Sequence, residues 1–213
     1  MRVPIAVALL AVGVLVARGE ASGAQTASLD LLRRATDPNP TLKSYTASAK
    51  LDATLHVVIP VHKSFDGTVY YLKPKRAIEF QNVSGSLSKF KDLVTSTPSY
   101  EGAMTQYTIT SLTDDGSESS YSLVPKKPGS RVKSLTVRVN DQSALIDRVV
   151  WSYTNGGSLR FAQTYGDPNG FRLPTKSDIA ARFPDYSVDG TITFANYVPN
   201  APVSPSIFIS PSP

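Results

Sequence analysis

Between Tyr45 and Ile59, apolar and polar side chains alternate at almost every position, and this pattern constrains the fold more than any other feature of the sequence. A period of two is typical of a strand with one buried and one solvated face. A strand of 15 residues would extend about 50 Å at roughly 3.3 Å per residue, several times the usual length. Such a strand has to bend or carry a bulge, so the pattern predicts a strongly curved sheet.

The alternation recurs in shorter runs separated by Gly, Asn, Asp or Pro, which is typical of consecutive hairpins. Turns are expected at 65–67 and 114–116, and short helices at 28–35 and 87–94. After the first strand, further strands are predicted at 68–73, 77–83, 105–112, 120–124, 132–140, 146–153, 158–165 and 186–198. The expected fold class is mainly β: a strongly curved antiparallel sheet forming an unclosed half-barrel, with short α-helices covering its concave face.

The two ends of the chain are expected to lie outside this domain. Residues 1–24 have the features of a signal peptide, with Arg2 before an apolar run and small residues before a cleavage site after Ala24. This indicates export to the periplasm, and an uncleaved membrane anchor is the alternative. The half-barrel is assigned to residues 25–198. The tail, 199–213, contains five prolines and is expected to be extended, with docking of residues 207–209 on the sheet as a second possibility.

Composition argues against most enzyme classes. The 213 residues include no cysteine, which excludes disulfides, thiolate metal sites, a cysteine nucleophile and an acylated N-terminal cysteine. His56 and His62 are six positions apart on one predicted strand, too far apart to share a metal ion. Asp114 and Asp115 precede a glycine and indicate a solvated hairpin turn rather than paired catalytic carboxylates. We therefore expect no catalysis, no metal and no cofactor.

The balance of 22 Lys and Arg against 17 Asp and Glu permits contact with anionic surfaces but does not require it. Nucleic-acid binding is not expected, because the aromatic residues alternate onto the apolar face instead of standing among the basic ones.

A family resemblance rests on the order and spacing of six segments. They are Leu42–Ala47, Gly67–Pro74, Tyr107–Ile109, Tyr121–Lys126, Leu135–Val139 and Phe194–Tyr197. Together they resemble the periplasmic outer-membrane lipoprotein carriers and their lipid-binding relatives, the LolA-like proteins. The resemblance implies an unclosed β-barrel with helices as a lid and a monomeric carrier of acyl chains. It also implies an inner-membrane donor complex and an outer-membrane acceptor as partners.

The resemblance also directs attention to Lys73. In the carriers, a basic residue before the proline of this strand lies at the cavity and matters for passing on the lipoprotein, and Lys73 before Pro74 matches it. The carriers typically have arginine there, and lysine cannot make the same planar bidentate contacts. The chain also lacks the Asp-Gly-x-x-x-Trp/Phe-x-Tyr strand pair of the carriers, which puts specificity for lipoproteins in question. Lys73, Lys75 and Arg76 either bind an acidic head group or form a charged strand end.

The apolar face of such a sheet is too large for two short helices to cover, so part of it is expected to line a cavity for acyl chains. The expected ligand-binding residues are Tyr71, Lys73, Phe80, Ile109, Leu123, Val137, Trp151, Phe161 and Phe194. The alternative is that these residues form a closed, packed core. In that case the protein would be a non-catalytic β scaffold that binds another envelope protein through a sheet edge or the tail.

Overall fold

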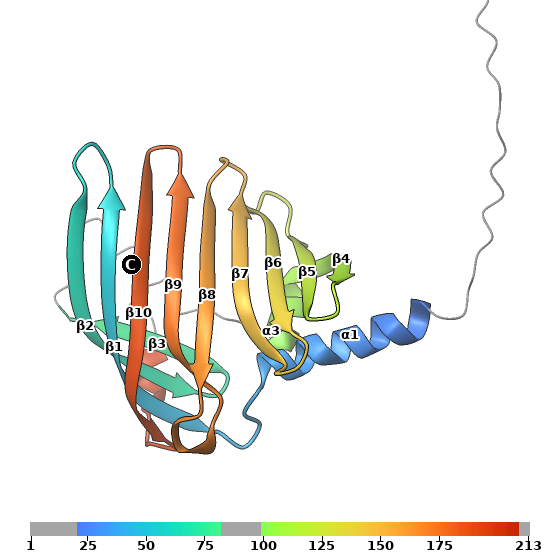
Figure 1. The fold of residues 1–213 in the computed structure, drawn as a ribbon, viewed down its shortest axis with the longest axis horizontal. Coiled ribbons are helices and arrows are strands. Elements are labelled where there is room, and N and C mark those ends of the chain that lie inside the picture. The colour runs from blue at the N-terminus through green and yellow to red at the C-terminus, as the bar shows by residue number, and fades with distance from the viewer. Residues whose placement is uncertain (1–20, 82–98, 209–213) are drawn as a thin grey trace, which may run out of the picture.

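The computed structural model describes residues 21–81 and 99–208, with side chains from Leu29 onwards. Ten strands form a single antiparallel sheet (Figure 1). They are β1 (Ser44–His56), β2 (Val61–Leu72), β3 (Lys75–Phe80), β4 (Tyr107–Asp114), β5 (Glu118–Pro125), β6 (Val132–Asn140), β7 (Leu145–Tyr153), β8 (Ser158–Gly166), β9 (Leu173–Phe183) and β10 (Tyr186–Pro199).

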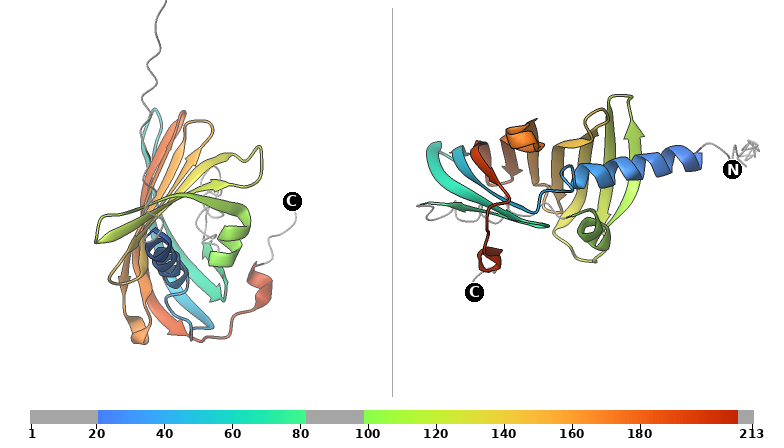
Figure 2. Two further views of the ribbon diagram at one scale, coloured as in Figure 1. Left: turned by 90° about the vertical axis from the view of Figure 1, so that its right-hand side faces the viewer. Right: turned by 90° about the horizontal axis from the view of Figure 1, so that it is seen from below.

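The sheet runs in the order β3-β2-β1-β10-β9-β8-β7-β6-β5-β4, so the described strands β3 and β4 are its two edges. Neighbouring strands are consecutive along the chain except at one place, where β1, the third strand from the β3 edge, pairs with β10, from Tyr45 opposite Pro199 to His56 opposite Ser187. The sheet curls around its apolar face and leaves one side open (Figure 2). The expected class, a curved and unclosed antiparallel half-barrel, is confirmed.

Helix α1 (Ala21–Thr36) lies inside the curve of the sheet (Figure 2). Leu31, Leu32 and Ala35 form its buried face against β6 and β7. These residues have the i, i+1, i+4 spacing of one side of a helix. The helix begins at Ala21 and ends at Thr36, so it is longer than the predicted 28–35, mainly at its N-terminal end.

A second helix, α3 (Tyr100–Gln106), was not predicted; the strand expected from residue 105 begins only at Tyr107. Ser99 caps α3 by accepting a hydrogen bond from the backbone N–H of Gly102 at 3.2 Å. The helix predicted at 87–94 lies outside the described residues.

The first hairpin differs from the prediction. β1 ends at His56, residues 57–60 form the turn, and the expected turn at 65–67 lies within β2. Gly67 permits a close approach of strands instead: a Cβ there would lie 2.6 Å from the carbonyl oxygen of Glu79. The alternation of apolar and polar residues continues on both sides of residues 57–60, so periodicity alone could not place the turn.

The placement of the two histidines on one strand was therefore also wrong, because they lie on neighbouring strands. The His56 ring lies 3.2 Å from the Asp189 carboxylate, and the His62 ring lies 3.2 Å from the hydroxyl of Thr54.

Strand β9 was missed entirely. The buried Ser177 occupies a position on the cavity side, and the pairing with β8 shifts register near Pro174, so the apolar alternation is weak there. By contrast, the turn at 114–116 is confirmed: the Asp114 carboxylate accepts a hydrogen bond from the backbone N–H of Gly116 at 2.7 Å. Gly116 has a φ of +86°, a backbone conformation that favours glycine.

The described part of the tail is not wholly extended. Pro205–Phe208 form one 3-10 turn, η3, which contacts β3. Upstream of it, the backbone N–H of Asn200 donates to the Ser44 carbonyl oxygen at 2.7 Å, and the Ser44 hydroxyl donates to the Ala201 carbonyl oxygen at 2.6 Å. The start of the tail is therefore joined to the start of β1.

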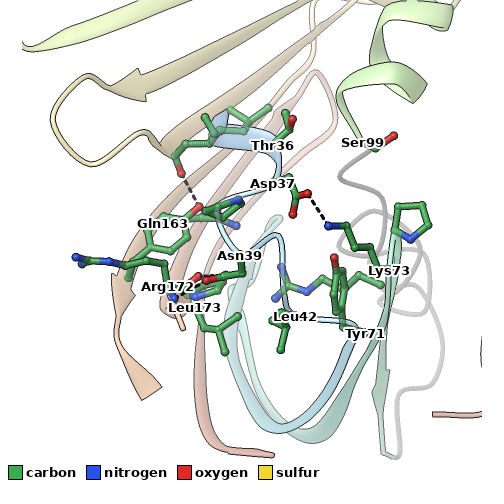
Figure 3. A pocket seen from close by; sticks show the side chains of 18 of the residues that line it. Thr36, Asp37, Asn39, Leu42, Tyr71, Lys73, Ser99, Gln163, Arg172 and Leu173 are labelled. Atoms are coloured by element: carbon green, nitrogen blue, oxygen red, sulfur yellow. Dashed lines mark hydrogen bonds and ion pairs between the residues drawn. The ribbon is translucent and has the colours of Figure 1, made fainter. Parts of the chain in front are cut away.

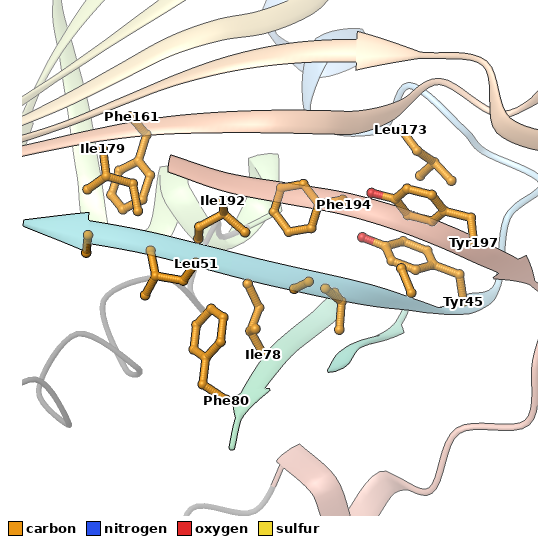
Figure 4. Packing of buried hydrophobic residues seen from close by; sticks show 14 of the residues in the cluster. Tyr45, Leu51, Ile78, Phe80, Phe161, Leu173, Ile179, Ile192, Phe194 and Tyr197 are labelled. Atoms are coloured by element: carbon orange, nitrogen blue, oxygen red, sulfur yellow. The ribbon is translucent and has the colours of Figure 1, made fainter. Parts of the chain in front are cut away.

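Two clusters of buried side chains fill the curve of the sheet. The larger spans β1–β3 and β8–β10 and includes Leu51, Ile78 and Ile192 (Figure 4). The smaller lies beneath α1 on β5–β7. Trp151 on β7 packs against both clusters. The concave face is thus packed at its two sides, with one tryptophan between them.

Candidate functional site

A cavity of about 580 Å³ lies on the concave face (Figure 3). Its walls come from the end of α1 and the loop that follows, the β2–β3 turn, the start of α3, and strands β7–β10. This volume is in the range of small-molecule sites, roughly 300–1,000 Å³. The packed-core alternative therefore does not describe the whole concave face.

Aromatic rings provide much of the cavity surface. Tyr45 stacks on Tyr71 with the ring centroids 5.0 Å apart, and Trp151 meets Phe161 edge to face at 5.6 Å. Tyr197 contacts Tyr45 edge to face, with the ring centroids 5.3 Å apart. Rings in these geometries pack rigidly, so the aromatic surface is preorganised.

Two tyrosines of the cavity, Tyr71 and Tyr165, remain uncharged at neutral pH. Burial, with smaller contributions from Asp37 and Tyr45, raises the pKa of Tyr71 to about 12. Burial also raises the pKa of Tyr165, whose hydroxyl lies 2.8 Å from the carbonyl oxygen of Ile146. The phenol groups therefore add hydrogen-bonding capacity to the cavity without adding charge.

The rim contains a small polar network. The Lys73 ammonium donates to the Asp37 carboxylate at 2.5 Å and to the Pro40 carbonyl oxygen at 3.3 Å. Asn39 exchanges two hydrogen bonds with the backbone of Arg172, at 2.7 and 2.8 Å. The loop after α1 is thus joined to the β2–β3 turn on one side and to Arg172, just before β9, on the other. Lys73 is 37% exposed, in keeping with a position at the mouth.

Of the nine residues expected to bind ligand, five line this cavity. They are Tyr71, Lys73, Trp151, Phe161 and Phe194. The other four lie outside its lining: Phe80 packs in the larger cluster, opposite Gly67, and Ile109, Leu123 and Val137 belong to or pack against the smaller cluster under α1. Alternation identifies the inward face of a strand, but it does not tell whether an inward side chain meets a helix or an empty space.

Several lining residues were not predicted, among them Tyr45, Arg76 and Tyr165. Tyr45 alternates onto the same face as the rest of β1, so its inward direction was readable from the sequence. Arg76 was considered with Lys73 and Lys75, either as a ligand for an acidic head group or as part of a charged strand end, and was not placed among the cavity residues. Its place in the cavity depends on the pairing of β3 with β2, where it lies opposite Tyr71.

The described residues contain no group of three or more His, Asp or Glu side chains that could hold a metal ion. A search of the same residues for a helix long and apolar enough to cross a membrane also found none.

Solved structures share this architecture. The chain aligns with a LolA superfamily protein from Nitrosomonas europaea at a TM-score of 0.52 and 9% identity, covering 86% of this chain and 97% of that one. An outer membrane lipoprotein-sorting protein domain from Vibrio parahaemolyticus aligns at 0.56 and 8%, covering 85% and 95%. The fold is LolA-like. A DUF1329 family protein from Desulfovibrio piger aligns with this chain at a TM-score of 0.51 and 15% identity, covering 87% of this chain and 97% of that one.

The sequence itself gives no such match. No protein-family model matches it, and no curated protein does either. At identities of 8 to 15% the structural likeness concerns the fold alone.

Proposed function

We propose that this protein is a soluble periplasmic carrier that binds the acyl chains of a lipoprotein or lipid and takes them across the periplasm to the outer membrane. The observation that supports this most directly is the cavity of about 580 Å³ between the sheet and its helices. A chain bound there would contact Trp151, Phe161 and Phe194 and would be shielded from water. The LolA-like fold adds support, since one similar structure is a lipoprotein-sorting domain.

The physical basis of carriage is burial alone. Moving a methylene group from water to an apolar site is favourable by about 0.8 kcal/mol. A chain of a dozen or more methylenes gains enough to bind after its ordering cost is subtracted. No bond is made or broken, so the proposed role is non-catalytic.

The proposed route includes export and exchange. A signal peptide ending at Ala24 would deliver the chain to the periplasm, where an inner-membrane donor complex loads it and an outer-membrane acceptor unloads it. The carrier acts as a monomer in this proposal, with the half-barrel over residues 25–198. A β scaffold that binds another envelope protein is less well supported, because it gives the cavity no use.

The deciding experiment is native mass spectrometry of the protein purified from the envelope of its own host. A bound acyl lipid, released by activation and identified by mass, is the expected result. The opposite result is a protein that carries no lipid when purified from the envelope and that also fails to bind a fluorescent fatty acid in solution. This would contradict the carrier proposal and favour the scaffold.

A further inference from the structure

Arg76 differs from the other cations of the cavity. It lies on β3, directly opposite Tyr71 on β2. Its guanidinium carbon sits 5.2 Å from the centre of the Phe194 ring on β10, and the side chain lines the cavity. The Arg76 charge also lowers the pKa of Tyr71 against the larger effect of burial, which agrees with its place near that ring. The cation is thus held among aromatic rings, inside the curve of the sheet.

The other basic residues of the lining already have carboxylate partners. Arg33 pairs with Asp30 at 3.2 Å, Lys73 with Asp37 at 2.5 Å, and Arg172 with Asp167 at 3.0 Å. Each of these three charges is therefore compensated within the protein, and each pair is substantially exposed to solvent.

Arg76 has no such compensation. Within the part of the chain that the structure describes, it forms no ion pair, and its buried Nε has no hydrogen-bond partner. A buried guanidinium nitrogen without a partner is unfavourable, and a stacked ring compensates the charge only in part. An unpaired cation at an apolar cavity is therefore ready to accept an anion.

We propose that Arg76 binds the anionic head group, a carboxylate or a phosphate, of the acyl lipid whose chain fills the cavity. The guanidinium presents several N–H donors in a planar fork that matches both kinds of oxyanion. The same site then holds a polar end at β3 and an apolar chain along Trp151 and Phe161. This inference rests on the proposed carrier function and narrows its cargo to acidic lipids.

The test measures binding of four probes to the full chain: palmitate, hexadecyl phosphate, the neutral hexadecanol, and inorganic phosphate. The wild type is expected to bind the two acidic lipids at least tenfold more tightly than hexadecanol. Arg76→Gln should remove this preference, a loss of roughly tenfold to a hundredfold for a charge-assisted contact, and lower hexadecanol binding by much less. Arg76→Lys should keep part of the preference.

Arg160→Gln is the matched control, since Arg160 is an exposed arginine on β8 outside the cavity lining. It should leave all four affinities unchanged, and melting curves establish that each variant is folded. Equal affinity of the wild type for palmitate and hexadecanol, or an equal loss for all lipids in Arg76→Gln, would overturn the inference while leaving the carrier proposal intact. Inorganic phosphate binding as tightly as hexadecyl phosphate would also overturn it, in favour of a free-anion site. Failure of every lipid, hexadecanol included, would instead contradict the carrier proposal.

Discussion

At the scale of single residues, Trp151 offers a direct report on the cavity because it is the only tryptophan in the chain. It is half-buried, lies between the two clusters and contacts Phe161. An acyl chain entering the cavity should exclude water from the indole and shift its emission to shorter wavelength.

The matched variants for this prediction are Trp151→Phe and Trp151→Ala. Both should abolish the lipid-dependent signal, but only Trp151→Ala should also weaken binding of a fluorescent fatty acid, because it removes the aromatic wall. Its stability cost should stay below the roughly 3–5 kcal/mol typical of a fully buried aromatic side chain. Equal binding by both variants would place the chain elsewhere.

The Lys73–Asp37 pair predicts an effect on transfer without a large effect on stability. Both side chains are more than a third exposed, and exposed ion pairs contribute about 0–1 kcal/mol. Lys73→Ala should therefore melt close to wild type, yet release cargo faster, because the loop after α1 loses its contact with the β2–β3 turn. The measurement is transfer of a fluorescent lipid between vesicles, with Asp37→Asn expected to behave alike. Unchanged transfer in both variants would reduce Lys73 to a surface residue.

The raised pKa of Tyr71 predicts that the free energy of unfolding falls at alkaline pH. Its pKa is raised to about 12 in the folded protein, against 10.0 for an ordinary tyrosine. The unfolded chain therefore loses this proton first, and stability falls as the pH rises from about 10 towards 12. Tyr71→Phe should make this fall shallower, as followed by chemical unfolding at a series of pH values. A variant with the same slope as the wild type would mean that other tyrosines carry the effect.

At the scale of elements, helix α1 both packs on the sheet and contributes residues to the cavity lining. Leu32 is 3% exposed on its buried face, while Arg33 and Thr36 from the same helix line the cavity. Leu32→Ala should destabilise the protein by about 2–4 kcal/mol. It should also raise hydrogen exchange across residues 29–36 and weaken acyl binding.

Arg34→Ala is the control for this prediction, since Arg34 is exposed on the same helix and does not line the cavity. Its stability and exchange should remain close to wild type. Equal exchange in the two variants would mean that α1 is not held by its buried face.

The elements also show how far the sequence could be read. Alternation identified most strands closely, and 132–140 matches β6 at both ends, because Leu135, Val137 and Val139 are large and regularly spaced. It failed at β9, where the polar Ser177 takes an inward position and the pairing with β8 shifts register, and at the first hairpin, where the alternation runs on across the turn. Those two regions are determined by pairing with neighbouring strands, which local pattern does not contain.

The candidate site was only partly readable, for a related reason. Tyr71 and Trp151 were assigned to an inner face, and both line the cavity. Leu123 is also an inner-face residue, but α1 covers its strand. Arg76 interrupts an apolar pattern, and only the register of β3 on β2 brings it beside Phe194. Depth and neighbours across the sheet are properties of the assembled fold.

At the scale of the whole molecule, the pairing of β1 with β10 inside the sheet predicts how the chain tolerates shortening. A chain ending at Phe183 lacks β10 and leaves β1 and β9 with unpaired edges, which favours aggregation. A chain ending at Val203 keeps β10 and the hydrogen bonds from Ser44 to the start of the tail. The first should be insoluble, and the second should melt near the full chain. Size-exclusion chromatography and thermal melting would decide, and a soluble, cooperatively melting 1–183 chain would contradict this view.

The same pairing has a consequence for when the protein becomes able to work. β1 is among the first strands to be synthesised and β10 is the last, so their pairing closes a loop of most of the chain and makes folding slow. β10 also supplies Ile192 and Phe194 to the cavity. Until β10 pairs, one edge of β1 lacks hydrogen-bond partners and the cavity lacks Phe194, the ring that Arg76 contacts. For the carrier proposed above, the capacity to hold cargo would therefore be complete only once β10 has paired with β1.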